Sequence, residues 1–186
     1  MNPPAQRTAR RFDLALAIAL TLAFLFCLHG ISWGCVECWN RDAMALRGLR
    51  GLRPGTYTKP PFHTYLSHNL VVWPVEGALR LAGVPKADWN RARPLILIAS
   101  RLVVAAMFLG IILLSYLLAF QFAGIFAARV IAWLLATSAG LVAYAHFLTA
   151  DIPVIFWMMV SFWFAAQIVS SDDRRHYFWA GFFVGR

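Results

Sequence analysis

The chain has 186 residues, of which 61% are hydrophobic and only 13% are charged, and its mean hydropathy is +0.65. A soluble domain carries charge on about a quarter of its residues, so this composition excludes an ordinary soluble fold and predicts an integral membrane protein. Lys and Arg outnumber Asp and Glu by 17 to 8, a net charge of +9, which suits anionic lipid headgroups or phosphate-bearing substrates. No recognition motif for nucleic acid accompanies these charges, which argues against nucleic acid as a partner.

The first apolar segment follows a polar, arginine-containing tail. Residues 1–11 are predicted to be a cytoplasmic tail, and residues 12–33 form a run whose single acid, Asp13, stands at its start. At 1.5 Å per residue this run can cross a ~30 Å hydrocarbon core, so it is predicted to be the first span. A cleaved signal peptide is the competing interpretation. The lack of a small-residue cleavage site and the later spans argue against it.

Three cysteines lie in or just beyond this run. Cys27 is predicted to be a small packed hydrophobe. Cys35 and Cys38 form a C-V-E-C pair, without the second pair of ligands that a zinc site needs. A local disulfide in an oxidising compartment and two free thiols are equal alternatives for this pair, and no metal is assigned.

Residues 34–94 form a long polar-to-amphipathic stretch, which we place outside as the first outer loop. Its basic residues run against the positive-inside rule, but loops of about 60 residues cross largely regardless of charge. Inside it, residues 62–84 are amphipathic and predict helices that lie in the membrane interface. Pro74 should end the first of these helices, and a second short piece over 75–82 should end before Gly83.

The second half of the chain alternates apolar runs with short polar connections. A connection at 123–129 carries Gly124, and a charged turn occupies 170–176. The last apolar stretch is too short to span a bilayer, which favours a truncated chain over an interfacial helix. The runs predict three further spans and the start of a fifth, at residues 95–122, 130–148, 152–169 and 177–186.

The predicted fold class is therefore an all-α polytopic membrane protein with four transmembrane helices plus a partial fifth. It has interfacial helices in a long first outer loop and forms a single transmembrane domain, the N-terminal module of a longer protein. The arginines of the tail and of the 170–176 turn both predict a cytoplasmic location, in agreement with four crossings between them. The protein is then integral to the cytoplasmic (inner) membrane. Its N-terminus lies on the cytoplasmic side and its active face lies outside.

Three ionic side chains share one side of the membrane in this topology. Asp42 and Lys59 follow the first span and Asp151 follows the third, so an odd number of crossings precedes each of them. Two carboxylates and an ammonium at one surface can form a site. Helix N-caps for the two acids, and a solvated loop charge for Lys59, remain open as alternatives.

An ordered set of motifs resembles a known family. T-Y-T-K-P-P-F-H-T-Y-L at residues 56–66 resembles the K-P-P loop of polyprenyl-phosphate-dependent membrane glycosyltransferases of the GT-C fold. These include protein O-mannosyltransferase-like and aminoarabinose-transferase-like enzymes. R-D-A-M-A-L-R-G-L-R at 41–50 resembles the preceding segment, in which an acid opens the first outer helix, and residues 128–153 are similar to the third span and its acidic corner. The order and spacing match over most of the chain, whereas no single motif is specific.

The resemblance implies an activity: transfer of a sugar from a polyprenyl-phosphate donor to an acceptor at the outer face, usually with inversion. It implies that Asp42 is the general base that takes the proton of the acceptor hydroxyl, and that Asp151 is a second acid in the same pocket. The family often has adjacent acids or an aromatic residue after the first acid, where Ala43 and Met44 stand here. Glu37 is therefore the alternative acid.

The basic side chains are implied to bind the donor. The Lys59 ammonium suits the leaving phosphate, because opposite charge is worth most where charge develops in the transition state. Arg101, about two turns into its span, either snorkels to the headgroups or reaches a lipid phosphate. His63 lies beside the K-P-P motif as a further substrate-binding candidate, with a solvated histidine as the alternative. No cofactor is assigned, and a divalent metal is left open.

The competing hypothesis is a non-catalytic membrane protein, such as a pseudo-enzyme, a transporter fragment or the membrane anchor of a further domain. A transporter places ionisable residues near the middle of its spans. The predicted spans here are nearly free of them apart from Arg101, which favours the glycosyltransferase. The motifs do not specify the acceptor, and membrane lipid is the remaining partner.

Overall fold

The computed structural model describes six stretches of the chain: residues 13–32, 71, 73–85, 93–146, 151–170 and 173–184. Every regular element in these stretches is a helix, and none of the described residues forms a strand, so the all-α prediction is confirmed for this part of the chain. The helices are α1 (Leu14–Leu28), α4 (Trp73–Leu81), α5 (Arg93–Ala136), α6 (Ala139–Ala145), α7 (Asp151–Ser170) and α8 (Arg174–Val184).

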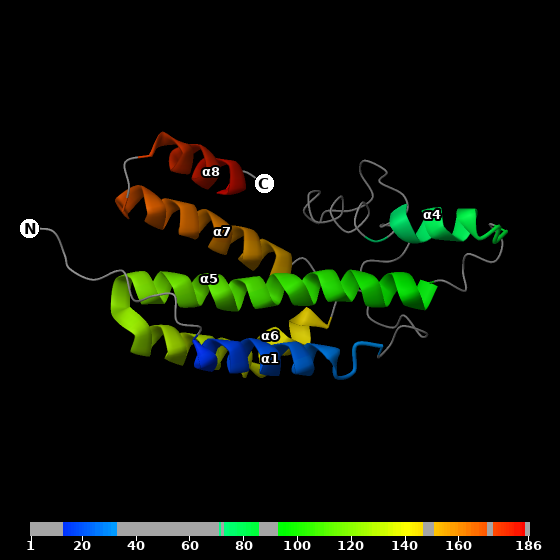
Figure 1. Ribbon diagram of the computed structural model, residues 1–186, viewed down its shortest axis with the longest axis horizontal. Coiled ribbons are helices and arrows are strands. Elements are labelled where there is room, and N and C mark those ends of the chain that lie inside the picture. Colours follow the sequence, from blue (N-terminus) through cyan, green and yellow to red (C-terminus); the bar gives the residue numbers. More distant parts are fainter. Residues whose placement is uncertain are drawn as a thin grey trace, which may run out of the picture.

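α5 is a helical hairpin rather than one straight rod. Its backbone leaves the helical region at Gly124, where φ is 83° and ψ is −179°, and the chain reverses there (Figure 1). Glycine adopts a positive φ without steric cost, which suits it to this turn. We call residues 93–123 the outgoing arm and residues 125–136 the return arm. The predicted connection at 123–129 contains this turn.

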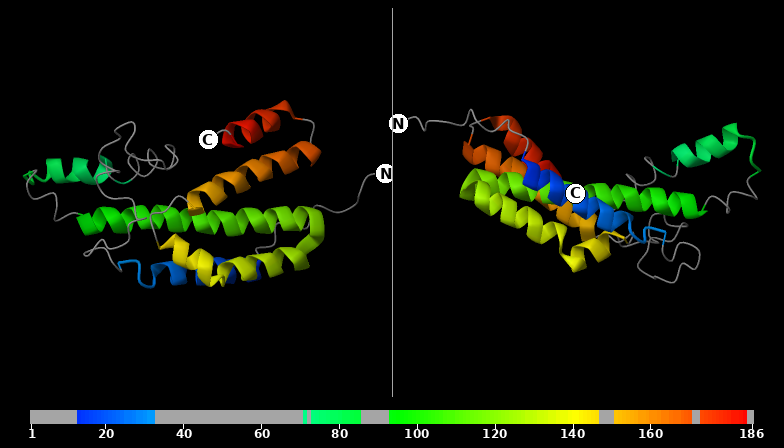
Figure 2. Two further views of the ribbon diagram at one scale, coloured as in Figure 1. Left: turned by 180° about the vertical axis from the view of Figure 1, so that it is seen from behind. Right: turned by 60° about the horizontal axis from the view of Figure 1, so that its bottom comes forward.

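The bundle has two ends with different contents (Figures 1 and 2). At the hairpin end lie the Gly124 turn, the start of α1, the end of α7 and the start of α8. At the loop end lie the start of α5 and the ends of α1 and α6, and α7 begins on this side. The helices α1 and α7 pack on α5, and α8 packs on α7.

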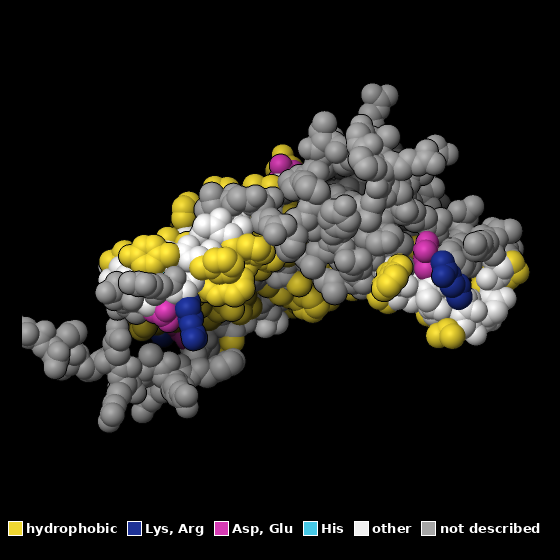
Figure 3. All heavy atoms as spheres, turned by 90° about the horizontal axis from the view of Figure 1, so that it is seen from above, with side chains coloured by type: hydrophobic (Ala, Val, Ile, Leu, Met, Phe, Trp, Pro, Cys, Tyr) yellow, Lys and Arg dark blue, Asp and Glu magenta, His cyan; other side chains and the backbone are white. Residues whose placement is uncertain are grey.

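Among the helices that the structure describes, two are long and apolar enough to cross a membrane, Pro94–Ala136 and Asp151–Val169. The first has 43 residues, and at 1.5 Å per residue it would be about twice as long as a ~30 Å hydrocarbon core if it were straight. Because the chain reverses at Gly124, the helix is divided into two shorter arms. Apolar side chains also cover much of the exposed surface (Figure 3), with Phe126, Leu134 and Val169 among the most exposed.

α1 is shorter than the apolar run that predicts it. The helix covers 15 residues, Leu14–Leu28, which is about 22 Å at 1.5 Å per residue, whereas the predicted span covers 12–33. Asp13 caps its start by accepting from the amide of Ala15 at 3.0 Å. The helix ends at His29, because Gly30 with φ 78° turns the backbone away although the hydropathy continues.

α4 confirms the prediction of a short helix that ends before Gly83. Pro74 is its second residue, a position in the first turn where the missing proline amide costs nothing. At the other end the amide of Gly83 donates to Arg80 O and that of Val84 to Leu79 O, both at 3.0 Å. With φ 70° at Gly83, this is a Schellman C-cap. The first predicted interfacial helix lies outside the described residues.

Small residues form the contact surfaces of α1 and of the return arm. Ala19, Ala23 and Cys27 follow each other at four-residue spacing on α1 and are fully buried. The return arm repeats this spacing with Ala128, Ala132 and Ala136, all inaccessible to solvent. Small side chains let helix backbones approach closely where no hydrophobic effect drives them together. The prediction that Cys27 is a packed hydrophobe is confirmed.

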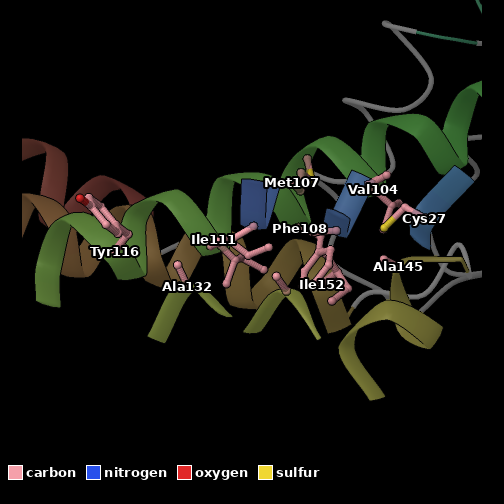
Figure 4. Packing of buried hydrophobic residues seen from close by; sticks show 14 of the residues in the cluster. Cys27, Val104, Met107, Phe108, Ile111, Tyr116, Ala132, Ala145 and Ile152 are labelled. Atoms are coloured by element: carbon pink, nitrogen blue, oxygen red, sulfur yellow. The ribbon is translucent and has the colours of Figure 1, made fainter. Parts of the chain in front are cut away.

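The outgoing arm supplies the large core residues between α1 and α7. Phe108 and Ile112 are fully buried there, and Ile152 of α7 lies beside Phe108 (Figure 4). Gly110 gives the Phe156 ring its space, since a Cβ at this position would lie 2.5 Å from a ring carbon. Packing of this closeness fixes how α7 crosses the outgoing arm.

α8 runs back along α7 through an aromatic contact surface (Figure 1). The rings of Trp157 and Phe183 are stacked with centroids 5.3 Å apart, and Phe164 stacks on Phe183 at 5.8 Å. The Ser161 hydroxyl donates to the carbonyl of Ala180 at 2.9 Å. α8 begins at Arg174, three residues before the predicted start of a fifth span.

Candidate functional site

The structure describes two of the predicted site residues, Arg101 and Asp151. The others lie outside the described residues, and so do both members of the Cys35 and Cys38 pair. They are the candidate base Asp42, the alternative acid Glu37, and the two loop side chains Lys59 and His63.

Arg101 is buried at the loop end, with 5% of its surface exposed. Its Nη1 donates to the carbonyl oxygen of Ile31 at 2.5 Å, just beyond the end of α1. Carbonyls at a helix C-terminus carry partial negative charge, which a guanidinium stabilises. The guanidinium therefore contributes to holding the end of α1 against the outgoing arm.

His146 contacts the same end of α1 from the end of α6. Its Nδ1 lies 2.8 Å from the carbonyl oxygen of Val142, and its Nε2 lies 2.8 Å from that of His29. A carbonyl only accepts, so a neutral imidazole donates to one of these oxygens at a time and the imidazolium donates to both. The sequence analysis missed this residue, whose role depends on a contact 117 positions away in the chain.

Asp151 is exposed and is the first residue of α7, ahead of the buried Ile152 and Pro153. It makes no ion pair or side-chain hydrogen bond with the part of the chain that the structure describes. A carboxylate in the first turn of a helix favours the positive end of the helix dipole. The side chain is therefore exposed at the N-terminus of α7.

The loop end brings these elements together around the outgoing arm. Figure 4 shows Cys27 of α1 and Ala145 of α6 near Val104, and Ile152 of α7 beside Phe108. The C-terminal end of α1 thus lies on the side of the bundle where α7 begins (Figure 1). A buried cation, a second basic side chain and an exposed carboxylate lie at this end.

A second polar cluster lies at the hairpin end. Oδ2 of Asp13 accepts from the Tyr116 hydroxyl at 2.5 Å and from Nε of Arg129 at 3.1 Å. The Asp13 side chain is 10% exposed and that of Arg129 is 50% exposed. The pKa of Asp13, which precedes α1, lies below its usual value, mainly because of the Tyr116 hydrogen bond; burial opposes this and Arg129 assists it.

The sequence analysis noted Asp13 but not its partners. A lone acid at the edge of an apolar run needs a cation or donors when it is buried, and this is the signal that could have found the cluster. The contacts join the start of α1 to the outgoing arm through Tyr116 and to the return arm through Arg129. No three His, Cys, Asp or Glu side chains gather into a metal site within the described stretches.

Comparison of the chain with protein-family models, with curated proteins and with solved structures finds no match. The family therefore rests on the ordered motifs of the sequence and enters below as a proposal.

Proposed function

We propose that this chain belongs to a GT-C-type membrane glycosyltransferase, which moves a sugar from polyprenyl phosphate to an acceptor with inversion. The observation that carries the proposal is the ordered set of Asp42, Lys59-Pro60-Pro61 and Asp151 in the sequence. Arg101 lies at the end of α1, and the segment that contains Asp42 and Lys59 follows α1 in the chain.

The proposed topology has four crossings. They are α1, the outgoing arm, the return arm continued by α6, and α7, with α8 as the beginning of a fifth. Two features support it: the chain reversal at Gly124 and the lengths of Pro94–Ala136 and Asp151–Val169. The arginine-rich hairpin end is cytoplasmic in this topology, and the loop end faces outside.

In the proposed reaction the carboxylate of Asp42 takes the proton of the acceptor hydroxyl as its oxygen attacks the anomeric carbon. The bond from that carbon to the phosphate oxygen breaks, and polyprenyl phosphate leaves with the electron pair. Lys59 stabilises the charge that develops on the phosphate. Asp151 orients the acceptor or the lysine.

Arg101 has two roles in this proposal. It is the candidate ligand of the lipid phosphate, and its bond to Ile31 O also holds the point where the outer segment starts. The second role makes Arg101 a positioning residue for Asp42 and Lys59.

The bond between Arg101 and Ile31 O also fits the alternative function, a non-catalytic membrane protein, in which this bond only stabilises the fold.

The test is sugar transfer from polyprenyl-phosphate sugars by the whole protein, including any continuation beyond residue 186. Asp42→Asn should lower the rate at least about a hundredfold, as expected for loss of a general base, with Asp151→Asn less severe. Asp173→Asn is the matched control, since it exchanges an exposed acid at the hairpin end. Unchanged transfer by Asp42→Asn in a folded preparation would remove Asp42 from the mechanism.

A further inference from the structure

An open apolar groove runs along the bundle toward the hairpin end, on the side where α7 crosses both arms of α5. Its volume is about 690 Å³. Apart from Ser115 its lining is entirely apolar, and it includes Ala119, Phe122, Ile131, Met159, Ala165 and Val169. It is separate from the loop-end residues of the proposed reaction.

The length of the groove matches half of a bilayer. On α7 it extends from Met159 to Val169, which is about 15 Å at 1.5 Å per residue, or half of a ~30 Å hydrocarbon core. On the outgoing arm, the groove residue nearest to the hairpin end is Phe122, two residues before the Gly124 turn. The groove therefore covers the depth of a single leaflet and reaches the surface at the hairpin end.

The hairpin end is basic. Arg129 is half-exposed there and Arg175 is exposed. The described segments 125–129 and 173–176 at this end carry three arginines against one aspartate, and Asp13 pairs with Arg129. Basic residues at a membrane surface attract anionic headgroups, at about 1 kcal/mol for each Lys or Arg near the surface.

We propose that this groove binds one acyl chain of an anionic phospholipid from the leaflet at the hairpin end, with its headgroup beside Arg129 and Arg175. Apolar lining, length and charge all fit such a lipid. The lipid-linked donor is not the occupant, because the loop-end cations proposed to bind its phosphate lie at the opposite end of the bundle. The proposal requires only that the apolar helices lie in a bilayer, so it stands independently of the sugar-transfer reaction.

The experiment uses photo-crosslinking in nanodiscs. The probe is a phosphatidylglycerol with a diazirine at mid-chain, in a phosphatidylethanolamine background, and crosslinked peptides are mapped by mass spectrometry. Crosslinks should concentrate on residues 159–169 and 115–122. They should be fewer on Phe24, Leu25 and Phe26 of α1, which are exposed apolar residues outside the groove. An even distribution over all exposed apolar faces would contradict the proposal.

Two matched variants sharpen the test. Ala165→Phe places a ring in the groove from an exposed position, and it should lower crosslinking at least about threefold, because the ring displaces the van der Waals contacts of the chain. Ala106→Phe, at an exposed position on the outgoing arm outside the groove, should change nothing. Equal crosslinking in both variants would overturn the proposal. If Ala165→Phe does not fold, the proposal is tested by the wild-type crosslink map and by Ala165→Leu, which should also lower crosslinking in the groove.

Two further results test whether the groove requires an anionic headgroup and whether its occupant is a lipid or a second copy of the chain. Replacement of phosphatidylglycerol by a diazirine phosphatidylcholine should reduce groove crosslinks in the wild type and leave those of Arg175→Gln unchanged. If both lipids crosslink equally in the wild type, the anionic requirement is wrong. If peptide–peptide crosslinks between copies cover the groove instead, its occupant is a second copy and the lipid proposal fails.

Discussion

The two ends of the bundle are held by different kinds of polar contact. At the hairpin end, side chains bind side chains: Asp13 accepts from Tyr116 and Arg129. At the loop end, basic side chains bind the backbone: Arg101 contacts Ile31 O and His146 contacts His29 O. Backbone carbonyls are present whatever the side chain, so the loop-end contacts place few demands on the side chains of residues 29 and 31.

The largest effect is expected from the buried cation of the loop end. Arg101→Met keeps an apolar stem but removes the charged donor to Ile31 O. We expect the free energy of unfolding to fall by about 2 kcal/mol, the range for hydrogen bonds that involve a charged group. Unfolding by SDS titration in detergent measures this. A loss below that of the hairpin-end variant would contradict the view that the loop end depends on Arg101.

The hairpin-end cluster should be somewhat less sensitive. Asp13→Asn keeps one acceptor oxygen for the amide of Ala15 but replaces Oδ2, the acceptor of Tyr116 and Arg129, by an amide nitrogen and removes the charge that pairs with Arg129. Because Arg129 is half-exposed, solvent screens the pair, and we expect a loss of about 1 kcal/mol. The same titration measures it. Asp173→Asn is the control and should be neutral, and equal losses in the two variants would show that the cluster contributes nothing.

His146→Gln tests whether the end of α1 depends on both contacts of His146, the one to Val142 O and the one to His29 O. Glutamine keeps a donor but cannot reach Val142 O and His29 O together. We expect a loss of about 1 kcal/mol, one neutral hydrogen bond, and faster amide exchange at residues 29–32. Unchanged exchange there would mean that His146 does not hold the end of α1.

The smallest effect is the pH dependence of the hairpin end. The pKa of Asp13 is lowered in the folded protein, chiefly by Tyr116, so the folded state favours the carboxylate. Its contribution to stability is complete well above the unfolded value of about 3.9 and is lost as the pH falls below it. The unfolding free energy of the wild type should therefore decline more steeply below about pH 4 than that of Asp13→Asn. Parallel curves would contradict this.

Much of the helical framework could be predicted from the sequence, because apolar runs and glycines are local signals. The turn at Gly124 and the end of α4 before Gly83 both follow from a glycine between periodic segments. The early end of α1 was missed, since hydropathy continues through residues 29–33 while the backbone turns at Gly30. The break at Thr137 and Ser138, which separates α6 from α5, falls inside the predicted third span for the same reason.

The polar contacts were much harder to predict. Tyr116 and Arg129 lie 103 and 116 positions from Asp13, and such pairs meet only once the hairpin has folded and α1 has packed on it. Arg101 was identified from its rarity in an apolar run, but its partner is a backbone oxygen, which sequence cannot mark. The roles of Asp42, Lys59 and Asp151 stay predictions that depend on motif order and on the side of the membrane.

The arrangement of the two ends across the bilayer underlies every proposal, and accessibility labelling tests it most directly. In a background with its three native cysteines replaced, Ser32→Cys and Asp151→Cys should react with an impermeant maleimide from one side of sealed vesicles. Asp173→Cys and Gly124→Cys should react only from the other side. Labelling of positions 151 and 173 from the same side would contradict the placement of the two ends on opposite sides of the bilayer.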